Sequence, residues 1–490
     1  MKCRIWQAAI LLSLMLVLCF SVHAEDLQAQ EISSENLVTE RENIADPYWL
    51  FDRINYAIGF MGANSRLTLE DPRGIGSLYF LFDQENGPYW VVNGDTGERA
   101  QCGLDNFLHD YVDLTELFDQ APKKVSIEFG DHPVKLGDLR VFTEGEPPAD
   151  VQRWERAPED GVDLMLCSAH SDDEQLFFAG VLPYYAGELD YPVQLVTFTR
   201  HRNQGAYRSH ELLNGLWAVG VKTYPVMGEF DDYYCEGLQQ GYTVYERSGI
   251  TEDIMLSYVV EQIRQYKPLV VLGHDVNGEY GHGAHCLYSD LVQKAVGISM
   301  DPEAFPESAE KWGTWDVPKT YLHAYPENIV HMDWNQPLTK FDGMTAYQVC
   351  KTYGFPAHES QYKGFAWYTA DSDRGEDIED FGPSYYGLFR TTVGPDQEKN
   401  DFFENLTTRE EQKRLEEEKL RQQEEAPQTE PSAEVTASQE TAASSGQEPT
   451  EPALQENAGT PKLLWIGLAA AVLIIAVLAV SLTVRKNNKK

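Results

Sequence analysis

The sequence predicts two folded regions: an antiparallel β-sandwich, then an α/β domain with a Rossmann-like, mostly parallel sheet and helices on both faces. Residues 46–155 hold short runs of aromatic and β-branched residues between turn signals, which is typical of antiparallel strands. Across residues 160–405, apolar strand-like runs alternate with helical stretches, a pattern that indicates a parallel sheet covered by helices. At 490 residues the chain is long enough for both domains and for further segments at its ends.

Those end segments predict export and a membrane anchor. Residues 1–24 combine two basic residues, an apolar run and a final Ala24, as secretory signal peptides do. Residues 463–484 hold no charge and would span about 33 Å as a helix. The basic tail 485–490 follows, and such residues favour the cytoplasmic side. We therefore expect a single-pass protein of the cell membrane, with an extracellular body and a cytoplasmic C-terminus.

The first domain is marked by strand-like runs separated by hairpin signals such as Asn93-Gly94. The clearest runs are Gly76–Phe82, Tyr89–Val92 and Lys124–Phe129. A region of this length and pattern predicts an antiparallel β-sandwich. The pattern resembles the galactose-binding-like, discoidin-type jelly roll, and this resemblance implies a glycan-binding role.

The second domain is marked by the alternation of two kinds of segment. The strand-like runs are Asp163–Ser168, Val193–Thr199, Thr223–Met227 and Leu269–Gly273. The helical stretches are Glu174–Ala186, Ala206–Val219, Thr251–Tyr266 and His282–Val296. We expect the aromatic-rich residues 299–406 to complete this domain. In such sheets the site lies beyond the carboxyl ends of the strands, so residues just after each strand are the candidates.

Composition narrows the class of partner. The formal net charge of −39 argues against nucleic acid, because the protein would repel its phosphates. Residues 406–461 begin with alternating charges, which predicts a solvated helix. They continue as a stalk without aromatic residues, which predicts disorder. Of seven cysteines, Cys3 and Cys19 leave with the signal, and the remaining odd number does not form a disulfide scaffold.

A histidine-acid cluster follows the first strand of the α/β domain, with the sequence His170-Ser171-Asp172-Asp173-Glu174. A catalytic zinc ion usually takes three ligands from His and Asp or Glu, and keeps a position for water. Here His170 and Asp173 can bend back to one ion, with Asp172 beside it. Taken alone, the acids are equally well explained as caps of the following helix, because carboxylates stabilise helix N-termini.

A second cluster follows the strand Leu269–Gly273. A Gly-rich polar loop leads into His282-Gly283-Ala284-His285, and the i, i+3 spacing places both histidines on one face of the next helix. If both clusters lie at one edge of the sheet, they supply three metal ligands and a spare acid-base group. Together they predict a single metal centre.

These motifs resemble the LmbE/PIG-L family of zinc-dependent N-deacetylases, which remove acetyl groups from N-acetylglucosaminyl compounds. The family's strand followed by Ala-His-Pro-Asp-Asp-Glu stands here as Ala169–Glu174, and its Gly-His-x-x-His element stands as Gly281–His285. Between them, an Arg-x-x-Glu helix matches Arg208–Glu211 and a Gly-x-x-Asp turn matches Gly228–Asp231. The resemblance covers residues 163–296.

The resemblance implies one zinc ion per chain, or another divalent ion, held by His170, Asp173 and His285. It makes Asp172 the general base, and His282 the group that stabilises the oxyanion or protonates the leaving amine. The chemistry agrees, because zinc lowers the pKa of its bound water to about 7 and a nearby carboxylate can take that water's proton. Zinc and a protonated His282 would offset the charge of the carbonyl oxygen.

The resemblance also gives Arg208 a contact with the substrate, while Asp231 would orient the site's histidine or the sugar. One position departs from the family pattern, because Ser171 stands where the family has proline. Serine loosens that turn slightly. No ligand or acid-base position is lost, so we expect an effect on rate and none on the type of reaction.

Three functional hypotheses follow. The leading one is a membrane-tethered extracellular zinc deacetylase that acts on N-acetylated sugars or glycoconjugates. The second is a surface carbohydrate-binding protein without turnover, against which the intact Asp172 argues. The third is an O-acetyl esterase that uses the same water activation.

Overall fold

The computed structural model describes residues 27–425, apart from residues 55–57, 201–205 and 371–380. Within these residues, no helix has the length and apolar character needed to cross a bilayer. The expected signal peptide (1–24), most of the expected stalk and the expected membrane helix (463–484) lie outside the described residues.

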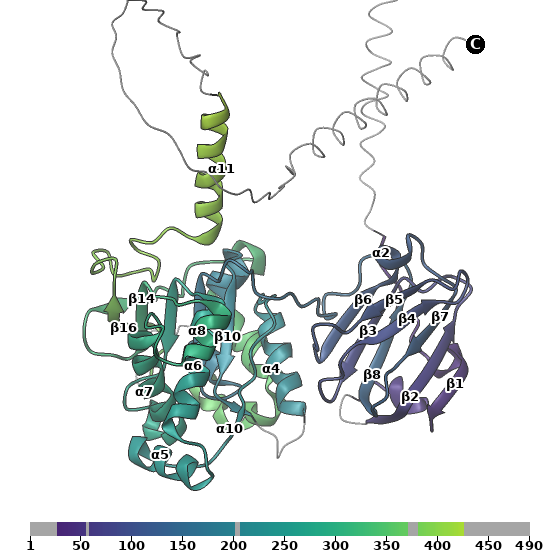
Figure 1. The fold of residues 1–490 in the computed structure, drawn as a ribbon, viewed down its shortest axis with the longest axis horizontal. Helices are drawn as coiled ribbons and strands as arrows, with labels where there is room; N and C mark the ends of the chain where they lie inside the picture. Colours follow the sequence, from purple (N-terminus) through teal and green to yellow (C-terminus); the bar gives the residue numbers. More distant parts are fainter. Residues whose placement is uncertain (1–26, 55–57, 201–205, 371–380, 426–490) are drawn as a thin grey trace, which may run out of the picture. The chain divides into compact units, whose positions relative to one another are not determined.

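The first domain is an antiparallel sheet of eight strands (Figure 1). The strands are β1 (Val38–Ile44), β2 (Gly59–Glu70), β3 (Ser77–Phe82), β4 (Tyr89–Asn93), β5 (Arg99–Cys102), β6 (His109–Asp113), β7 (Lys124–Glu128) and β8 (Val134–Phe142). The short helices are η1 (Glu35–Leu37), η2 (Tyr48–Leu50) and α2 (Leu114–Phe118). The three strand-like runs read from the sequence are therefore confirmed as β3, β4 and β7.

Two features of this domain differ from the sequence prediction. Hydrogen bonds join all eight strands into one sheet, where two separate sheets were expected. The cause is the long β2, which pairs with β7 over residues 66–70 and with β8 over residues 59–61. The domain also begins before residue 46, because β1 pairs with β2. β1 carries charged residues and is mostly exposed, so no apolar alternation marked it.

The second domain is built on a six-stranded sheet in the order β10-β9-β13-β14-β16-β15. Its strands are β9 (Leu164–Ser168), β10 (Val193–Thr197), β13 (Val270–Gly273), β14 (Lys319–His323), β15 (Ile329–His331) and β16 (Tyr385–Thr391). The first four in the order run parallel, while β16 pairs antiparallel with both β14 and β15. The mostly parallel sheet is confirmed, and residues 299–406 complete it as expected.

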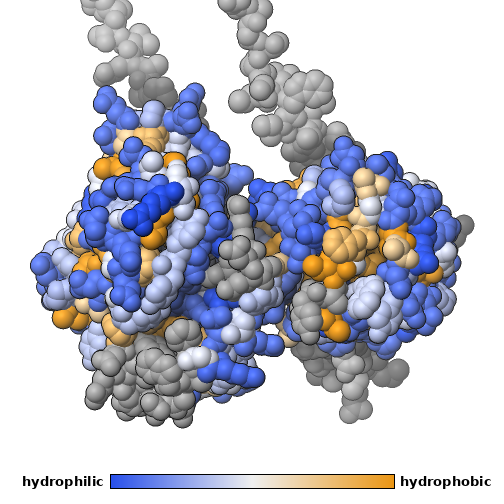
Figure 2. Space-filling view, turned by 90° about the horizontal axis from the view of Figure 1, so that it is seen from below, coloured by the Kyte–Doolittle hydropathy of each residue, from blue (hydrophilic) through white to orange (hydrophobic). Residues whose placement is uncertain are grey.

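Helices cover both faces of this sheet. They are α3 (Asp173–Leu176), α4 (Tyr207–Ala218), α5 (Gly237–Arg247), α6 (Glu252–Tyr266), α7 (Gly283–Ile298), α8 (Pro306–Trp312), α9 (Ala346–Val349) and α10 (Glu359–Ala370). Shorter turns are η3 (Pro183–Glu188), η5 (Glu279–Gly281), η6 (Thr339–Phe341), η7 (Cys350–Gly354) and η8 (Phe355–Ala357), and the exposed helix α11 (Arg409–Glu425) follows the domain. Alternate residues of β9 serve two cores: Leu164 and Leu166 pack with α4, while Met165 and Cys167 pack with α6 and α7. Figure 2 shows one face of the molecule, where most residues are hydrophilic and smaller areas are hydrophobic.

The helix expected over residues 174–186 is wrong in its length. α3 ends at Leu176, and Gly180 has a φ of 100°, a left-handed conformation that interrupts a helix. Pro183 then opens the separate turn η3, because a proline cannot donate a hydrogen bond within a helix. The chain after the first cluster therefore turns sharply.

The strand expected over residues 223–227 is also wrong. Only isolated bridges form there, Glu155 with Thr223 and Val196 with Val226. Pro225 has no backbone N–H to donate to a ladder. By contrast, the helices expected over residues 206–219, 251–266 and 282–296 are present as α4, α6 and α7.

A buried ion pair holds the chain after β16 against β14, and we expect its loss to be costly. Lys319 is fully buried and pairs with Asp396, whose other oxygen accepts the hydroxyl of Tyr321 at 2.6 Å. Lys319→Ala leaves a buried carboxylate without its cation, so we expect about 3–5 kcal/mol less free energy of unfolding. Lys294→Ala, which breaks a surface pair with Glu252, should cost about 0–1 kcal/mol. Urea unfolding curves give the free energy of unfolding of both variants. Equal losses of this free energy would contradict a buried ion pair between Lys319 and Asp396.

Candidate metal centre

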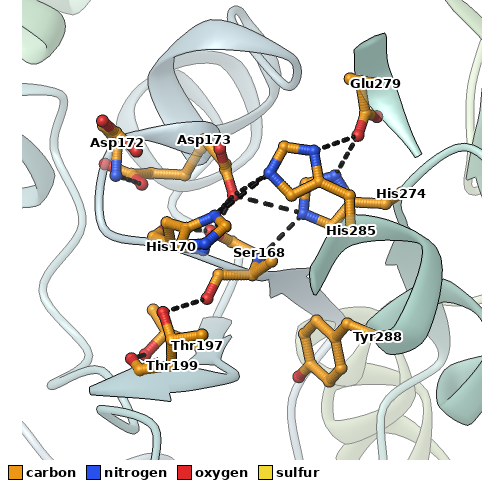
Figure 3. Close-up of polar contacts among 12 residues, drawn as sticks. Ser168, His170, Asp172, Asp173, Thr197, Thr199, His274, Glu279, His285 and Tyr288 are labelled. Carbon is orange, nitrogen blue, oxygen red and sulfur yellow. Dashed lines mark hydrogen bonds and ion pairs between the residues drawn. The ribbon is translucent and has the colours of Figure 1, made fainter. Parts of the chain in front are cut away.

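The candidate residues lie where the parallel strands end. The first cluster follows β9, the second follows β13, and His323 is the last residue of β14. These three strands are neighbours in the sheet, so both predicted clusters and His323 lie at one edge. Figure 3 shows the side chains from the β9 and β13 segments directed toward one another.

Three atoms form a nearly equilateral triangle. Nδ1 of His170 lies 3.1 Å from Oδ2 of Asp173 and 3.1 Å from Nε2 of His285. Nε2 of His285 lies 3.2 Å from the same Asp173 oxygen. Ligands about 2.0–2.1 Å from a tetrahedral zinc lie about 3.3 Å apart. The three residues expected to hold the metal are thus brought together at the spacing that a metal requires.

Two further carboxylates face the outer nitrogens of these histidines. Nε2 of His170 lies 3.3 Å from Oδ1 of Asp232, and Nδ1 of His285 lies 2.9 Å from Oε2 of Glu279. Because a carboxylate oxygen only accepts hydrogen bonds, each histidine can keep its proton on the outer nitrogen. Both inner nitrogens then direct lone pairs toward the Asp173 oxygen. Three electron-rich atoms that converge in this way fit a bound cation.

Protons compete with a metal for this triangle, which predicts a pH-dependent affinity. Burial alone would lower the pKa of His170, but Asp173 and Asp232 raise it to about 9. Below that pH a proton must leave before a metal binds, so affinity should rise by at least about tenfold per pH unit between pH 6 and 8. Competition with a chelator of known pH dependence measures the zinc dissociation constant. A zinc affinity that does not change with pH would contradict the assignment of His170 as a metal ligand.

Glu279 links three histidines at the closed side of the site. Oε2 faces Nδ1 of His274 at 2.7 Å as well as His285, and Oε1 faces Nδ1 of His323 at 2.7 Å. Nε2 of His323 also donates to the carbonyl of Gly382 at 3.0 Å. Both ring nitrogens of His323 therefore face acceptor oxygens. Burial would raise the pKa of Glu279, but these histidines hold it well below its usual range.

A nitrogen of His274 also lies within 4.8 Å of ligand atoms of Asp173 and His285, but its contacts assign it to this supporting group. Nε2 of His274 lies 3.5 Å from Asp173, and it accepts the backbone N–H of Ala169 at 2.9 Å. Its lone pair is therefore already used. The ring stacks on His285, with centroids 4.4 Å apart and planes 9° apart, and this contact fixes the orientation of the ligand.

Asp172 is buried beside the triangle in an unusual backbone conformation. Its φ of 147° is rarely adopted by a residue with a side chain. The Asp172 N–H donates to Oε2 of Glu174 at 2.9 Å, and Oε1 of Glu174 faces Nε2 of His358 at 2.8 Å. Burial and the charge of Asp173 raise the pKa of Asp172, although Arg208 opposes them. A base with a raised pKa works nearer neutral pH.

Arg208 lies deep in the site. Its guanidinium is 3.5 Å from Oδ2 of Asp172 and donates to the carbonyl of Ser171. Glu211, one turn along α4, accepts from the backbone and side chain of Ser360 at 2.7 Å. Arg208 therefore steadies the turn that contains Ser171, at the position where the family has proline.

His282 lies next to two of the ligands. Its ring centroid is 4.8 Å from those of His170 and His285, and one of its nitrogens lies within 4.8 Å of their ligand atoms. Burial, together with His170 and His285, lowers the pKa of His282 to about 3. This lowered pKa favours a neutral ring that offers one N–H, whereas the sequence-based prediction is a protonated His282.

The acid that contacts a ligand is Asp232, one residue after the expected Asp231. β12 (Phe230–Asp231) pairs in parallel with β11 (Thr199–Arg200). Successive side chains of an extended chain point in opposite directions. The Asp231 carbonyl accepts the hydroxyl of Tyr245, while Asp232 contacts His170. The residue that contacts the ligand His170 is therefore one position later in the chain than the residue that the motif predicted.

Sequence reasoning missed the residues that support the ligands. Glu279 and His274 lie in the loop that carries the second cluster, where the density of polar residues was the only signal. His323 and His358 lie far along the chain in less regular segments, and no motif marked them. Asp232 adjoins a matched motif, so strand alternation was the signal for it.

Three comparisons bear on this site. Residues 165–296 match the family model described as PIG-L, GlcNAc-PI de-N-acetylase. A 1D-myo-inositol 2-acetamido-2-deoxy-alpha-D-glucopyranoside deacetylase of Streptomyces scabiei is 28% identical over 192 residues, covering 35% of this chain and 58% of the relative. A deacetylase of the same name from Streptomyces avermitilis is 23% identical over 292 residues, covering 50% and 97%.

Among solved structures, the N,N'-diacetylchitobiose deacetylase of Pyrococcus horikoshii aligns with a TM-score of 0.32 and 16% identity, covering 47% of this chain and 85% of that chain. The family match includes both metal-site clusters, one after β9 and one after β13. The resemblance stated from the motifs is confirmed at the level of the domain. Residues 165–296 are therefore similar to the PIG-L family, whose model they match.

Proposed function

We propose that this protein is a zinc-dependent N-deacetylase that hydrolyses the acetamide group of N-acetylglucosamine-type sugars or glycoconjugates. The observation that carries the proposal is the triangle of His170, Asp173 and His285 with Asp172 buried beside it. Amide hydrolysis needs an activated water and a base within reach of that water. The names of the similar deacetylases support the choice of substrate class.

Each residue has a role that follows from its surroundings. Bound zinc would supply Lewis acidity and a water of lowered pKa. Asp172 takes the proton of the attacking water and can return it to the leaving nitrogen. A neutral His282 donates its N–H to the carbonyl oxygen as negative charge develops there. Nδ1 of His282 is buried and has no hydrogen-bond partner among the described residues.

The test is a combined measurement of metal content and acetate release. The full-length chain is loaded with zinc and incubated with N-acetylglucosamine, N,N'-diacetylchitobiose and O-acetylated sugars. We expect about one zinc per chain and acetate release from the N-acetyl compounds. The O-acetyl compounds separate a deacetylase from an esterase that uses the same site.

The alternatives make different predictions in that experiment. Zinc binding without acetate release from any compound would favour a carbohydrate-binding protein. Release from O-acetyl sugars alone would favour an esterase. A chain that binds no zinc would overturn the proposal.

We also propose that the protein is membrane-tethered, with its body outside the cell. The support is the signal-like segment 1–24, the uncharged segment 463–484 and the basic tail 485–490. A chain that ends at residue 461 should be released into the medium, whereas the full-length chain should stay with membranes after carbonate washing. Protease added to intact cells should cut the body. Retention of the shortened chain, or protection of the body, would contradict this proposal.

A further inference from the structure

The segment that follows β12 turns alternate side chains toward the metal centre. Asp232 and Tyr234 are exposed, whereas Tyr233 is half-buried and Cys235 is buried. The Tyr233 ring packs on Tyr245, with centroids 5.1 Å apart. Asp232 contacts His170 and the Tyr234 ring lies beside His282, so both side chains lie next to the metal centre.

Backbone contacts fix this segment to the second cluster. The N–H of Gly283 donates to the carbonyl of Cys235 at 2.8 Å, and Glu236 forms an antiparallel bridge with His282. A Cβ at position 283 would lie 2.4 Å from Sγ of Cys235, so only glycine allows this approach. The hydroxyl of Tyr234 donates to Glu236 at 3.3 Å. Tyr234 is thereby held in place relative to the catalytic histidine.

The result is an exposed aromatic ring beside the metal centre. The Tyr234 side chain is 79% exposed, yet its ring centroid lies 6.0 Å from that of His282, with the planes at 72°. Asp232 is one-third exposed and also lies next to the metal centre. A flat apolar ring beside a carboxylate suits a ligand with one apolar face and hydroxyl groups at its edge.

We propose that Tyr234 is a specificity-determining residue that selects a pyranose ring. The C–H face of the sugar lies on the phenol ring, and Asp232 accepts a hydroxyl, since a carboxylate offers several acceptor positions. This places the acetamide group toward His282 and the metal triangle. The inference deepens the proposed function and rests on it for the position of the acetamide. It distinguishes cyclic sugars from acyclic acetamides that have the same scissile bond.

The experiment measures binding separately from turnover. Zinc-loaded full-length chain carrying Asp172→Asn is titrated with N,N'-diacetylchitobiose and with acyclic N-acetylethanolamine. Adding Tyr234→Ala should weaken binding of the sugar about five- to tenfold, because one aromatic stacking contact is lost. Binding of the acyclic compound should not change. Tyr234→Trp should restore sugar binding, since it restores an aromatic face.

A control and a separate assay make the outcomes distinct. Tyr385→Ala removes another exposed tyrosine, near the β15 edge of the sheet, and should leave both affinities unchanged. Equal losses for both compounds, no loss for the sugar, or no sugar binding at all would overturn the role of Tyr234. If the chain without substitutions releases no acetate but binds the sugar through Tyr234, the proposed function fails while this inference stands.

Discussion

Asp172→Asn should lower kcat by about a hundredfold to ten-thousandfold while leaving zinc in place. That is the usual contribution of a positioned general base. Asparagine keeps the shape of the side chain, but its amide cannot take a proton from water. The three ligand atoms come from His170, Asp173 and His285, so the metal should remain. Acetate release and zinc content measured on the same sample show both effects.

A matched substitution strengthens this test. Asp231→Asn changes a nearby acid. The contact of Asp231 with Tyr245 is made by its backbone carbonyl, which this substitution keeps, so we expect much smaller losses of kcat. If Asp172→Asn keeps near-normal kcat, Asp172 is not the base. If it loses zinc as well as activity, its role is structural, because its strained turn supports the ligands.

Glu279→Gln should weaken zinc binding by about 10- to 100-fold, the usual effect of removing a group that orients a metal ligand. Glu279 faces three imidazoles with two oxygens: it accepts from His274 and His323, and it lies 2.9 Å from Nδ1 of His285. A glutamine side chain has one acceptor oxygen and one donor NH₂ group, so it cannot satisfy all three rings. It also removes the buried negative charge that these three rings face. We therefore expect the free energy of unfolding to fall by about 3–5 kcal/mol.

Two measurements check this expectation. Chelator competition gives the zinc affinity, and urea unfolding of the metal-free chain gives the stability. Glu303→Gln removes an exposed carboxylate and keeps the backbone N–H of residue 303, which donates to Oδ1 of Asp301. It should change neither the zinc affinity nor the stability. Unchanged zinc affinity in Glu279→Gln would show that Glu279 does not orient His285.

The fold could be predicted where periodicity and burial coincide. α4, α6 and α7 have clear apolar periodicity, and β9 and β13 are short apolar runs with polar loops after them. β1 could not be predicted, because an exposed strand with charged side chains has no apolar alternation. α3 was overextended because a glycine and a proline break an otherwise helical pattern.

Within the site, only the residues that belong to the sequence motifs could be predicted. His170, Asp173 and His285 belong to two local patterns, and sheet order explains why those patterns meet. Glu279, His323 and His358 act through tertiary contacts between segments that are distant in the sequence. Their roles depend on which hydrogen-bond partner each ring meets, and no spacing in the sequence encodes that.

The central claim is that the two clusters form one zinc site, and the absorption spectrum of the zinc-loaded chain at the zinc edge tests it most directly. We expect nitrogen and oxygen ligands at about 2.0–2.1 Å, with the scattering pattern of two imidazoles. The spectrum should lose one imidazole in His285→Ala. Sulfur ligands at about 2.3 Å would contradict the claim, because the metal would then be held by cysteines such as Cys235 or Cys286.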